Sequence, residues 1–177
     1  LTSLINFFNQ FNSTIYKAEK INTHGGSIRI YIKKGKKLKI ENNVKVLLKE
    51  EEIFGLKKFK TYQDFGKKIN KLKENVTKNI NELKKNNKNI VGFGAPAKAT
   101  TALNFFGISK QIDYVIEDNK LKHNKFIPGV LIPIKDKKAL KEKNALILVL
   151  AWNFFQEIKK NNSKLSNKFV NIKELEN

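Results

Sequence analysis

The sequence has 177 residues but no cysteine and no methionine, and it contains a single arginine and two histidines. Without cysteine the chain can form neither a disulfide nor a thiolate metal site, which fits a reducing cytoplasm. His24 and His123 are too few to hold a metal ion by themselves, so we expect no metal site. No apolar run reaches the roughly 18 residues that a membrane span needs, and residues 1–12 are too polar for a secretory signal. These absences predict a cytoplasmic protein without a membrane partner.

Because methionine is absent, the sequence does not begin with its own start residue, so we expect either a mature or trimmed chain or a piece of a longer protein. Residues 2–12 place Leu4, Ile5, Phe8 and Phe11 on one helical face, and strands are expected at 14–21 and 27–34 around the glycine turn at 22–27. One helix and one hairpin bury too little surface to be stable alone. We therefore expect this opening unit to belong to a larger sheet.

The formal net charge of +20 raises the question of a nucleic-acid partner. Of the 36 basic residues only Arg29 is arginine, the residue whose planar fork favours phosphate and base recognition. The lysines are spread along the whole chain. We interpret them as a solvated surface and expect no nucleic-acid partner.

The rest of the chain alternates between expected helices and strands. Residues 33–47 form a connector without a strong period, and a short helix should end at Gly55. A long amphipathic helix follows, with Thr61 and Asp64 as a candidate capping box at its start. Strands are expected at 89–94, 111–118, 145–152 and 169–175, and an extended segment at 128–134. Helices are expected at 97–106, 137–143 and 154–162, the first of these ending at Gly107. This alternation predicts an α/β domain with a parallel sheet and helices on its faces.

The segment "GFGAPAK" at 92–98 lies where the first strand of this sheet passes into a helix. Glycine allows close approach of a ligand, and the helix N-terminus offers unpaired amides to an anion. The pattern predicts a phosphate or pyrophosphate close to the backbone of Gly92 and Gly94, with Lys98 adding a positive charge. The pattern lacks the third glycine of the dinucleotide fingerprint, so a ligand-free turn is the alternative. Residues 117–129 and 151–153 follow two further strands and should lie at the same edge.

Four segments together resemble a known family: "EKINTHGGSIRIY", "GFGAPAKATTALNFFGI", "IEDNKLKHNKFIPGVLIPI" and "ILVLAWNFFQEI". They are similar to the C-terminal part of the S-adenosylmethionine-dependent C-methyltransferases that act on nucleotide-linked keto sugars. The resemblance covers nearly the whole chain. It implies that residues 1–35 are the C-terminal end of a class I methyltransferase domain. Residues 36–60 would then be a connector, and residues 61–177 a Rossmann-like C-terminal domain that binds the substrate.

The resemblance also implies which residues hold the nucleotide-sugar. The positions that match the family are Gly92, Gly94, Ala95, Pro96, Ala97, Lys98, Asn104, Asn119, Lys122, Lys125, Pro128, Gly129, Trp152 and Asn153. We assign the diphosphate to the glycine turn and Lys98, and phosphate or sugar hydroxyls to Asn119, Lys122 and Lys125. Pro128 and Gly129 are expected to form a turn, and Trp152 to pack. The segments "IEDN" and "HNK" depart from the family pattern, which puts the contacts of that loop in doubt.

The family's cofactor loop, zinc cysteines and catalytic Glu-His pair would all lie before Leu1. S-adenosylmethionine would thus be bound mainly by upstream residues, and zinc only by a separate N-terminal domain. Within the chain, His24 is the one candidate for a catalytic role, and a turn histidine bonded to its own loop is the alternative. We expect the chain alone to be inactive, with the remainder of its methyltransferase domain as a possible partner.

Two other functions stay open at this point. A nucleotide- or dinucleotide-binding module of another enzyme would need an acidic residue about twenty positions after the glycine turn, and Glu117 and Asp118 stand near that place. A basic nucleic-acid-binding protein would show binding that falls steeply with salt.

Overall fold

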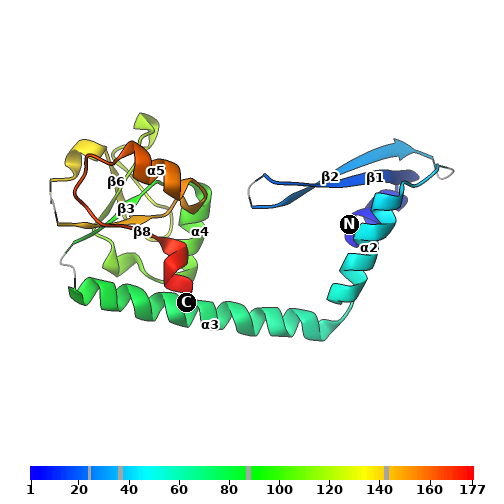
Figure 1. The fold of residues 1–177 in the computed structure, drawn as a ribbon, viewed down its shortest axis with the longest axis horizontal. Helices are drawn as coiled ribbons and strands as arrows, with labels where there is room; N and C mark the ends of the chain where they lie inside the picture. Colours follow the sequence, from blue (N-terminus) through cyan, green and yellow to red (C-terminus); the bar gives the residue numbers. More distant parts are fainter. Residues whose placement is uncertain (24, 36–37, 87–88, 142–143) are drawn as a thin grey trace. The chain divides into compact units, whose positions relative to one another are not determined.

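The computed structural model of the protein describes all residues except 24, 36–37, 87–88 and 142–143. The chain divides into two compact units, residues 1–67 and 68–177 (Figure 1). Within the described part of the chain, no helix is both long enough and apolar enough to span a bilayer. The candidate site lies in the second unit.

The first unit consists of two helices and a hairpin. Helix α1 (Thr2–Asn9) precedes the antiparallel strands β1 (Ser13–Ile21) and β2 (Ser27–Lys34), and α2 (Asn42–Phe54) follows them. The register of the strands shifts between Ile15 and Lys17, which is a bulge in β1. The predicted order of helix, strand, turn and strand is confirmed. His24 lies outside the described residues.

The core of this first unit is small. Among its described apolar residues, Ile15, Ala18 and Val44 are buried, whereas Ile28 and Ile32 on β2 are 38% and 39% exposed. The connector expected at 33–47 is wrong from Asn42 onward, because α2 begins there. Val44, Leu47 and Leu48 have the spacing of one helical face, and this helix ends at the predicted Gly55, whose φ is 83°.

The long helix α3 (Phe59–Asn86) begins two residues before the expected cap. The Thr61 hydroxyl donates to the carbonyl oxygen of Gly55 at 2.8 Å, so it stabilises the preceding turn and is not the N-cap. Residues from Lys68 onward belong to the second unit, where Val76 and Ile80 are fully buried. The predicted amphipathic stripe is therefore confirmed over this part of the helix.

The second unit contains a six-stranded sheet with the order β5-β6-β4-β3-β7-β8 among the described residues. Its neighbouring strands are parallel except for β5, which is antiparallel to β6. The strands are β3 (Ile90–Phe93), β4 (Tyr114–Ile116), β5 (Lys125–Phe126), β6 (Pro133–Lys135), β7 (Leu146–Val149) and β8 (Phe169–Asn171). The predicted α/β class with a mostly parallel sheet and flanking helices is confirmed.

Helices cover both faces of this sheet (Figure 1). Alternate side chains of a strand point to opposite faces, so Ile90 and Leu148 pack with α3 and α4 (Ala97–Phe106). Val91 and Ile147 pack on the other face with α5 (Phe155–Asn161). Both faces are buried, which explains why the strand sequences are continuous apolar runs.

Short 3₁₀ helices replace two expected elements. The helix expected at 137–143 is only a 3₁₀ turn, η3 (Lys137–Ala139), and residues 142–143 lie outside the described part. The strand expected at 169–175 ends at Asn171, where a capping box with Glu174 starts η5 (Ile172–Glu176). The other 3₁₀ helices are η1 (Ser109–Gln111), η2 (Lys120–Lys122) and η4 (Trp152–Phe154).

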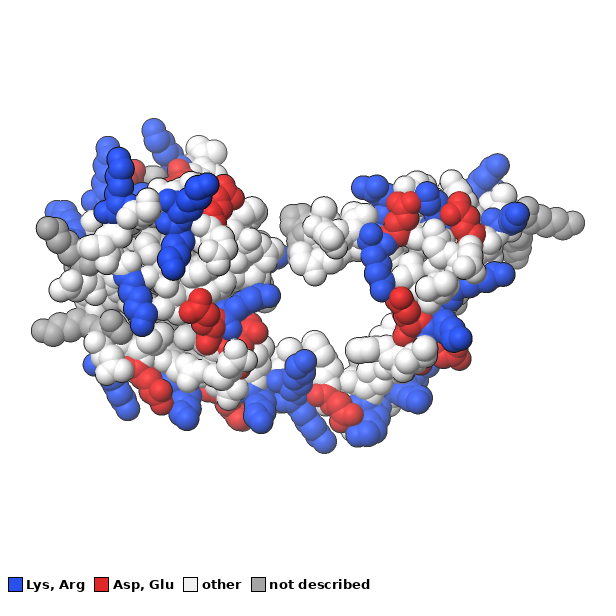
Figure 2. Space-filling view, in the orientation of Figure 1, with Lys and Arg blue, Asp and Glu red and all other residues white. Residues whose placement is uncertain are grey.

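The lysines are dispersed over the surface. Figure 2 shows lysine and arginine side chains on both units with aspartate and glutamate side chains between them, and no continuous basic stripe on the face drawn.

Candidate functional site

The carboxyl ends of β3, β4 and β7 lie along one edge of the sheet, because these strands are parallel neighbours. The turn at Gly94, the loop at Glu117 and the turn at Ala151 follow them and border a cleft of about 380 Å³, here called the carboxyl-edge cleft. The predicted convergence of three strand ends is confirmed. The polar side chains that line the cleft belong to Glu117, Asp118, Lys122, Lys137, Glu157, Asn161 and Asn162.

The two glycines of the turn are required by packing. Gly92 is buried within β3, where an added Cβ would lie 2.8 Å from Val115 Cγ2 and 3.0 Å from Leu150 Cδ1. Gly94 has a φ of 87°, and its Cβ would lie 2.9 Å from that of Ala151. Gly92 therefore does not face a ligand, and Gly94 allows the β3 and β7 turns to approach each other.

The amides of the turn already have acceptors within the protein. The amide of Gly94 donates to the carbonyl oxygen of Ile116 at 2.8 Å, and that of Ala95 donates to Glu117 Oε2 at 2.8 Å. The structure therefore leaves neither amide free for the predicted diphosphate, because the Ile116 carbonyl oxygen accepts the first and the Glu117 carboxylate accepts the second. The amides of Ala97 and Lys98, one turn later at the start of α4, have no acceptor among the described residues.

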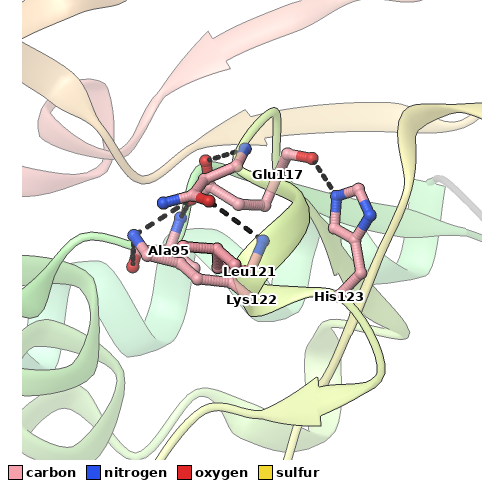
Figure 3. Close-up of polar contacts among 6 residues, drawn as sticks. Ala95, Glu117, Leu121, Lys122 and His123 are labelled. Atoms are coloured by element: carbon pink, nitrogen blue, oxygen red, sulfur yellow. Dashed lines mark hydrogen bonds and ion pairs between the residues drawn. The ribbon is translucent and has the colours of Figure 1, made fainter.

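The Glu117 carboxylate connects the β3 turn to the β4 loop (Figure 3). Besides Ala95 it accepts the amide of Asn119 at 3.1 Å, and the Lys122 ammonium lies 3.5 Å from Oε2 and donates to the carbonyl oxygen of Ala95 at 3.0 Å. Burial raises the pKa of Glu117, but the two amide hydrogen bonds and the Lys122 charge outweigh it and hold the pKa below the ordinary value. Glu117 is thus an ionised structural anchor.

The rest of this loop is ordered by local hydrogen bonds. Asn119 Oδ1 accepts the amide of Leu121 at 3.0 Å and caps η2. A ring nitrogen of His123, Nε2, lies 2.7 Å from the carbonyl oxygen of Glu117 (Figure 3), and Nδ1 lies 3.8 Å from Asp136 Oδ2. The side chain of His123 is 15% exposed, and its contacts hold the loop in place. Asn119 itself is exposed.

A second hollow of about 450 Å³ lies on the face of the sheet that α4 covers, here called the aromatic groove. Lys98 and Trp152 belong to this groove, and the Lys98 ammonium lies 5.6 Å from the centroid of the Trp152 ring. The sequence had placed Lys98 with the glycine turn. In the structure it lines the aromatic groove and not the carboxyl-edge cleft. The groove is lined by Ile69, Leu72, Lys98, Thr101, Ala102, Phe105, Phe106, Trp152, Ile172, Lys173 and Glu176.

Three further predicted residues lie outside both hollows. Asn104 on α4 donates to the carbonyl oxygen of Pro128 at 2.9 Å, and an added Cβ on Gly129 would lie 2.2 Å from Asn104 Oδ1. Asn104 thus packs against the predicted Pro128–Gly129 turn. Lys125 is exposed on β5, and Asn153 is exposed in η4.

Comparison with known proteins identifies the family. A family model described as the C-methyltransferase C-terminal domain matches residues 22–172. The chain belongs to this family. The match begins directly after β1 and ends at Ile172, so it includes the lining of the carboxyl-edge cleft and most of the lining of the aromatic groove of this C-methyltransferase C-terminal domain.

One similar curated protein is the C-methyltransferase NovU of Streptomyces niveus. It is 28% identical over 161 residues, which cover 89% of this chain and 38% of NovU. The chain therefore spans well under half the length of this relative.

The described residues of the C-methyltransferase C-terminal domain offer no complete cofactor site. An adenosyl or dinucleotide cofactor would use free amides of the glycine turn and a free carboxylate for the ribose hydroxyls. Here Ala95 and Glu117 are bonded to each other instead. The described residues also bring together no group of three histidine, aspartate or glutamate side chains around a possible metal ion.

Sequence reasoning missed the role of Glu117 and the existence of the aromatic groove. The position of Glu117 directly after a strand could have identified this role, but we considered Glu117 only as the acidic residue of a dinucleotide site. Trp152 was expected to pack, and it does pack against the core while its ring also lines the groove. From the sequence, Phe105 and Phe106 are ordinary apolar residues of a helix. Their periodicity does not indicate that other elements will form a hollow around them.

Proposed function

We propose that this chain is the substrate-binding part of an S-adenosylmethionine-dependent C-methyltransferase that acts on a nucleotide-linked keto sugar. The observation that carries the proposal is the family match over residues 22–172. The carboxyl-edge cleft supports it, because ligands of parallel α/β sheets bind outside the carboxyl ends of the strands. The similarity to NovU agrees with methyl transfer to carbon.

In this proposal the cleft binds the sugar. Asp118, Glu157 and Asn161 line it with acceptors and an amide that suit hydroxyl groups, and the Lys137 ammonium lies 3.8 Å from Asp118 Oδ1. The diphosphate lies at the unpaired amides of Ala97 and Lys98, where the helix dipole also favours an anion. Lys122, Lys125, Asn119 and Asn153 stay candidates for contacts with the phosphates or the sugar.

Methyl transfer to carbon requires loss of a proton from the carbon next to the ketone and stabilisation of the negative oxygen that results. S-adenosylmethionine supplies the electrophilic methyl group when it is bound. We propose that parts of the protein outside this chain bind it, because Glu117 and the turn amide of Ala95 are engaged with each other. The same engagement counts against the dinucleotide-binding alternative.

The test is calorimetric titration of the chain with a thymidine diphosphate keto sugar and, separately, with NAD. We expect saturable binding of the sugar nucleotide and much weaker binding of NAD. We also expect that the chain with the sugar nucleotide and S-adenosylmethionine releases no S-adenosylhomocysteine, because the catalytic groups lie elsewhere. Tighter binding of NAD, or binding of neither compound, would contradict the proposed substrate, and turnover by the chain alone would contradict the division of roles.

A further inference from the structure

The aromatic groove has an unusual lining for an exposed hollow. The rings of Trp152, Phe105 and Phe106 lie on its walls together with the aliphatic side chains of Ile69 and Leu72. Phe105 is 38% exposed, and the Trp152 ring is only partly buried against the core. Apolar walls with several aromatic rings suit a flat ring that stacks, as bases do on aromatic side chains.

The charges around the groove are mainly positive. Lys98 and Lys173 line it, the Lys98 ammonium lies 5.6 Å from the Trp152 ring centroid, and the Lys73 ammonium lies 5.3 Å from that of Phe105. Glu176 is the one carboxylate among the described lining residues. The combination fits an aromatic ligand that carries negative charge, whereas an apolar protein segment would not need the three ammonium groups.

The groove and the carboxyl-edge cleft are neighbours along the chain. Pro96 lines the cleft and Lys98 lines the groove, and in the β7 turn Ala151 and Phe154 line the cleft while Trp152 lines the groove. The β3 turn and the β7 turn therefore each contribute lining residues to both hollows. The unpaired amides of Ala97 and Lys98 lie between them in sequence.

We propose that the aromatic groove binds the base of the nucleotide, with the ring of Trp152 as its stacking platform and Lys98 and Lys173 beside its phosphates. The inference rests on the function proposed above and adds a position for the base. The nucleotide then passes from the groove over the start of α4 to the sugar in the cleft.

Trp152 is the single tryptophan of the chain, so its fluorescence reports on this groove alone. The first experiment titrates the chain with thymidine diphosphate and, as the control without a base, with inorganic pyrophosphate. Both titrations are followed by calorimetry and by tryptophan emission. We expect thymidine diphosphate to change the emission with the same Kd that calorimetry gives, and to bind about tenfold or more tightly than pyrophosphate. Equal Kd values, or binding heat without a change in emission, would overturn the inference.

The second experiment changes the ring itself. We expect Trp152→Leu to weaken thymidine diphosphate about tenfold or more and to leave pyrophosphate unchanged, and Trp152→Phe to restore most of the affinity. Phe126→Ala is the matched control, because that ring on β5 is 58% exposed and lies outside the groove. Circular dichroism checks that each variant is folded. If Trp152→Leu does not fold, the emission titration of the unaltered chain decides whether the base binds in the groove.

The outcomes separate this inference from the function on which it rests. If the sugar nucleotide binds but Trp152 neither reports nor affects binding, the base lies elsewhere and only the inference fails. If neither the sugar nucleotide nor thymidine diphosphate binds, the proposed function fails with it. An effect of Phe126→Ala as large as that of Trp152→Leu would mean that the loss is not specific to the groove and would also overturn the inference.

Discussion

Substitution of Glu117 by glutamine tests whether this carboxylate holds the carboxyl edge together. The carboxylate accepts amides from Ala95 at 2.8 Å and from Asn119 at 3.1 Å, and its side chain is 14% exposed. Glutamine keeps one acceptor oxygen but presents an NH₂ group to the second amide, and it loses the attraction of Lys122. Because a hydrogen bond to a charged group contributes about 1.5–3 kcal/mol, we expect Glu117→Gln to lower the free energy of unfolding by about 2 kcal/mol.

The assay is urea unfolding followed by far-ultraviolet circular dichroism, supported by thermal melts. For a unit of the size of residues 68–177, a loss of this magnitude corresponds to a fall in melting temperature of roughly 6–12 °C. Glu157→Gln is the matched control, since Glu157 lines the same cleft but is exposed and accepts no hydrogen bond from the described residues. We expect the control to change stability by less than about 0.5 kcal/mol.

The pH dependence gives the same test a second readout. The pKa of Glu117 is lower in the folded protein than its ordinary value of 4.5. Its contribution to stability is therefore fully present above the ordinary pKa and is lost as the pH falls through the lower folded-state pKa. We expect the stability difference between the unaltered chain and Glu117→Gln to shrink below about pH 4.5. A variant as stable as the unaltered chain at pH 7, or a difference that is constant down to pH 2, would refute the reasoning.

Two further predictions concern packing around the site. In urea unfolding, Gly94→Ala should lower the unfolding free energy by about 2–4 kcal/mol, because the added Cβ lies too close to Ala151 and the positive φ is strained. Gly107→Ala, with φ 68° and open space around it, should lower it by only about 1 kcal/mol. Equal losses would contradict the close approach of Gly94 to Ala151. Asn104→Ala removes the hydrogen bond to the Pro128 carbonyl oxygen, so it should accelerate hydrogen exchange at residues 127–132 with little change in global stability. Unchanged exchange would show that this bond does not hold the turn.

Much of the fold was predictable because the second unit has strong local patterns. Short apolar runs such as 146–149 are buried on both faces, and glycines such as Gly107 end helices through their positive φ. Predictions failed where a side chain forms a hydrogen bond with the backbone of a nearby turn. Thr61 was expected to cap α3 but bonds the preceding turn. Asn171 caps a 3₁₀ helix where the strand was expected to continue.

The candidate site was predictable only in outline. The glycine turn and the loop after β4 were expected at one edge, and they do lie there. The sequence could not indicate that Glu117 would bond the amide of Ala95, since the two residues are 22 positions apart and meet only through the pairing of β3 with β4. It also could not place Lys98 beside Trp152, because that contact depends on how α4 packs on the sheet.

The sequence by itself determined the alternation of strands and helices, the position of the glycine turn and the family to which the segments are similar. These properties follow from local backbone preferences and from apolar periodicity, which act over a few residues. The fold in three dimensions was needed to show which amides of the turn are free, which carboxylate accepts the others and which aromatic rings surround a hollow. Each of these depends on the register of neighbouring strands and on helix packing, which bring together residues that are far apart in the chain.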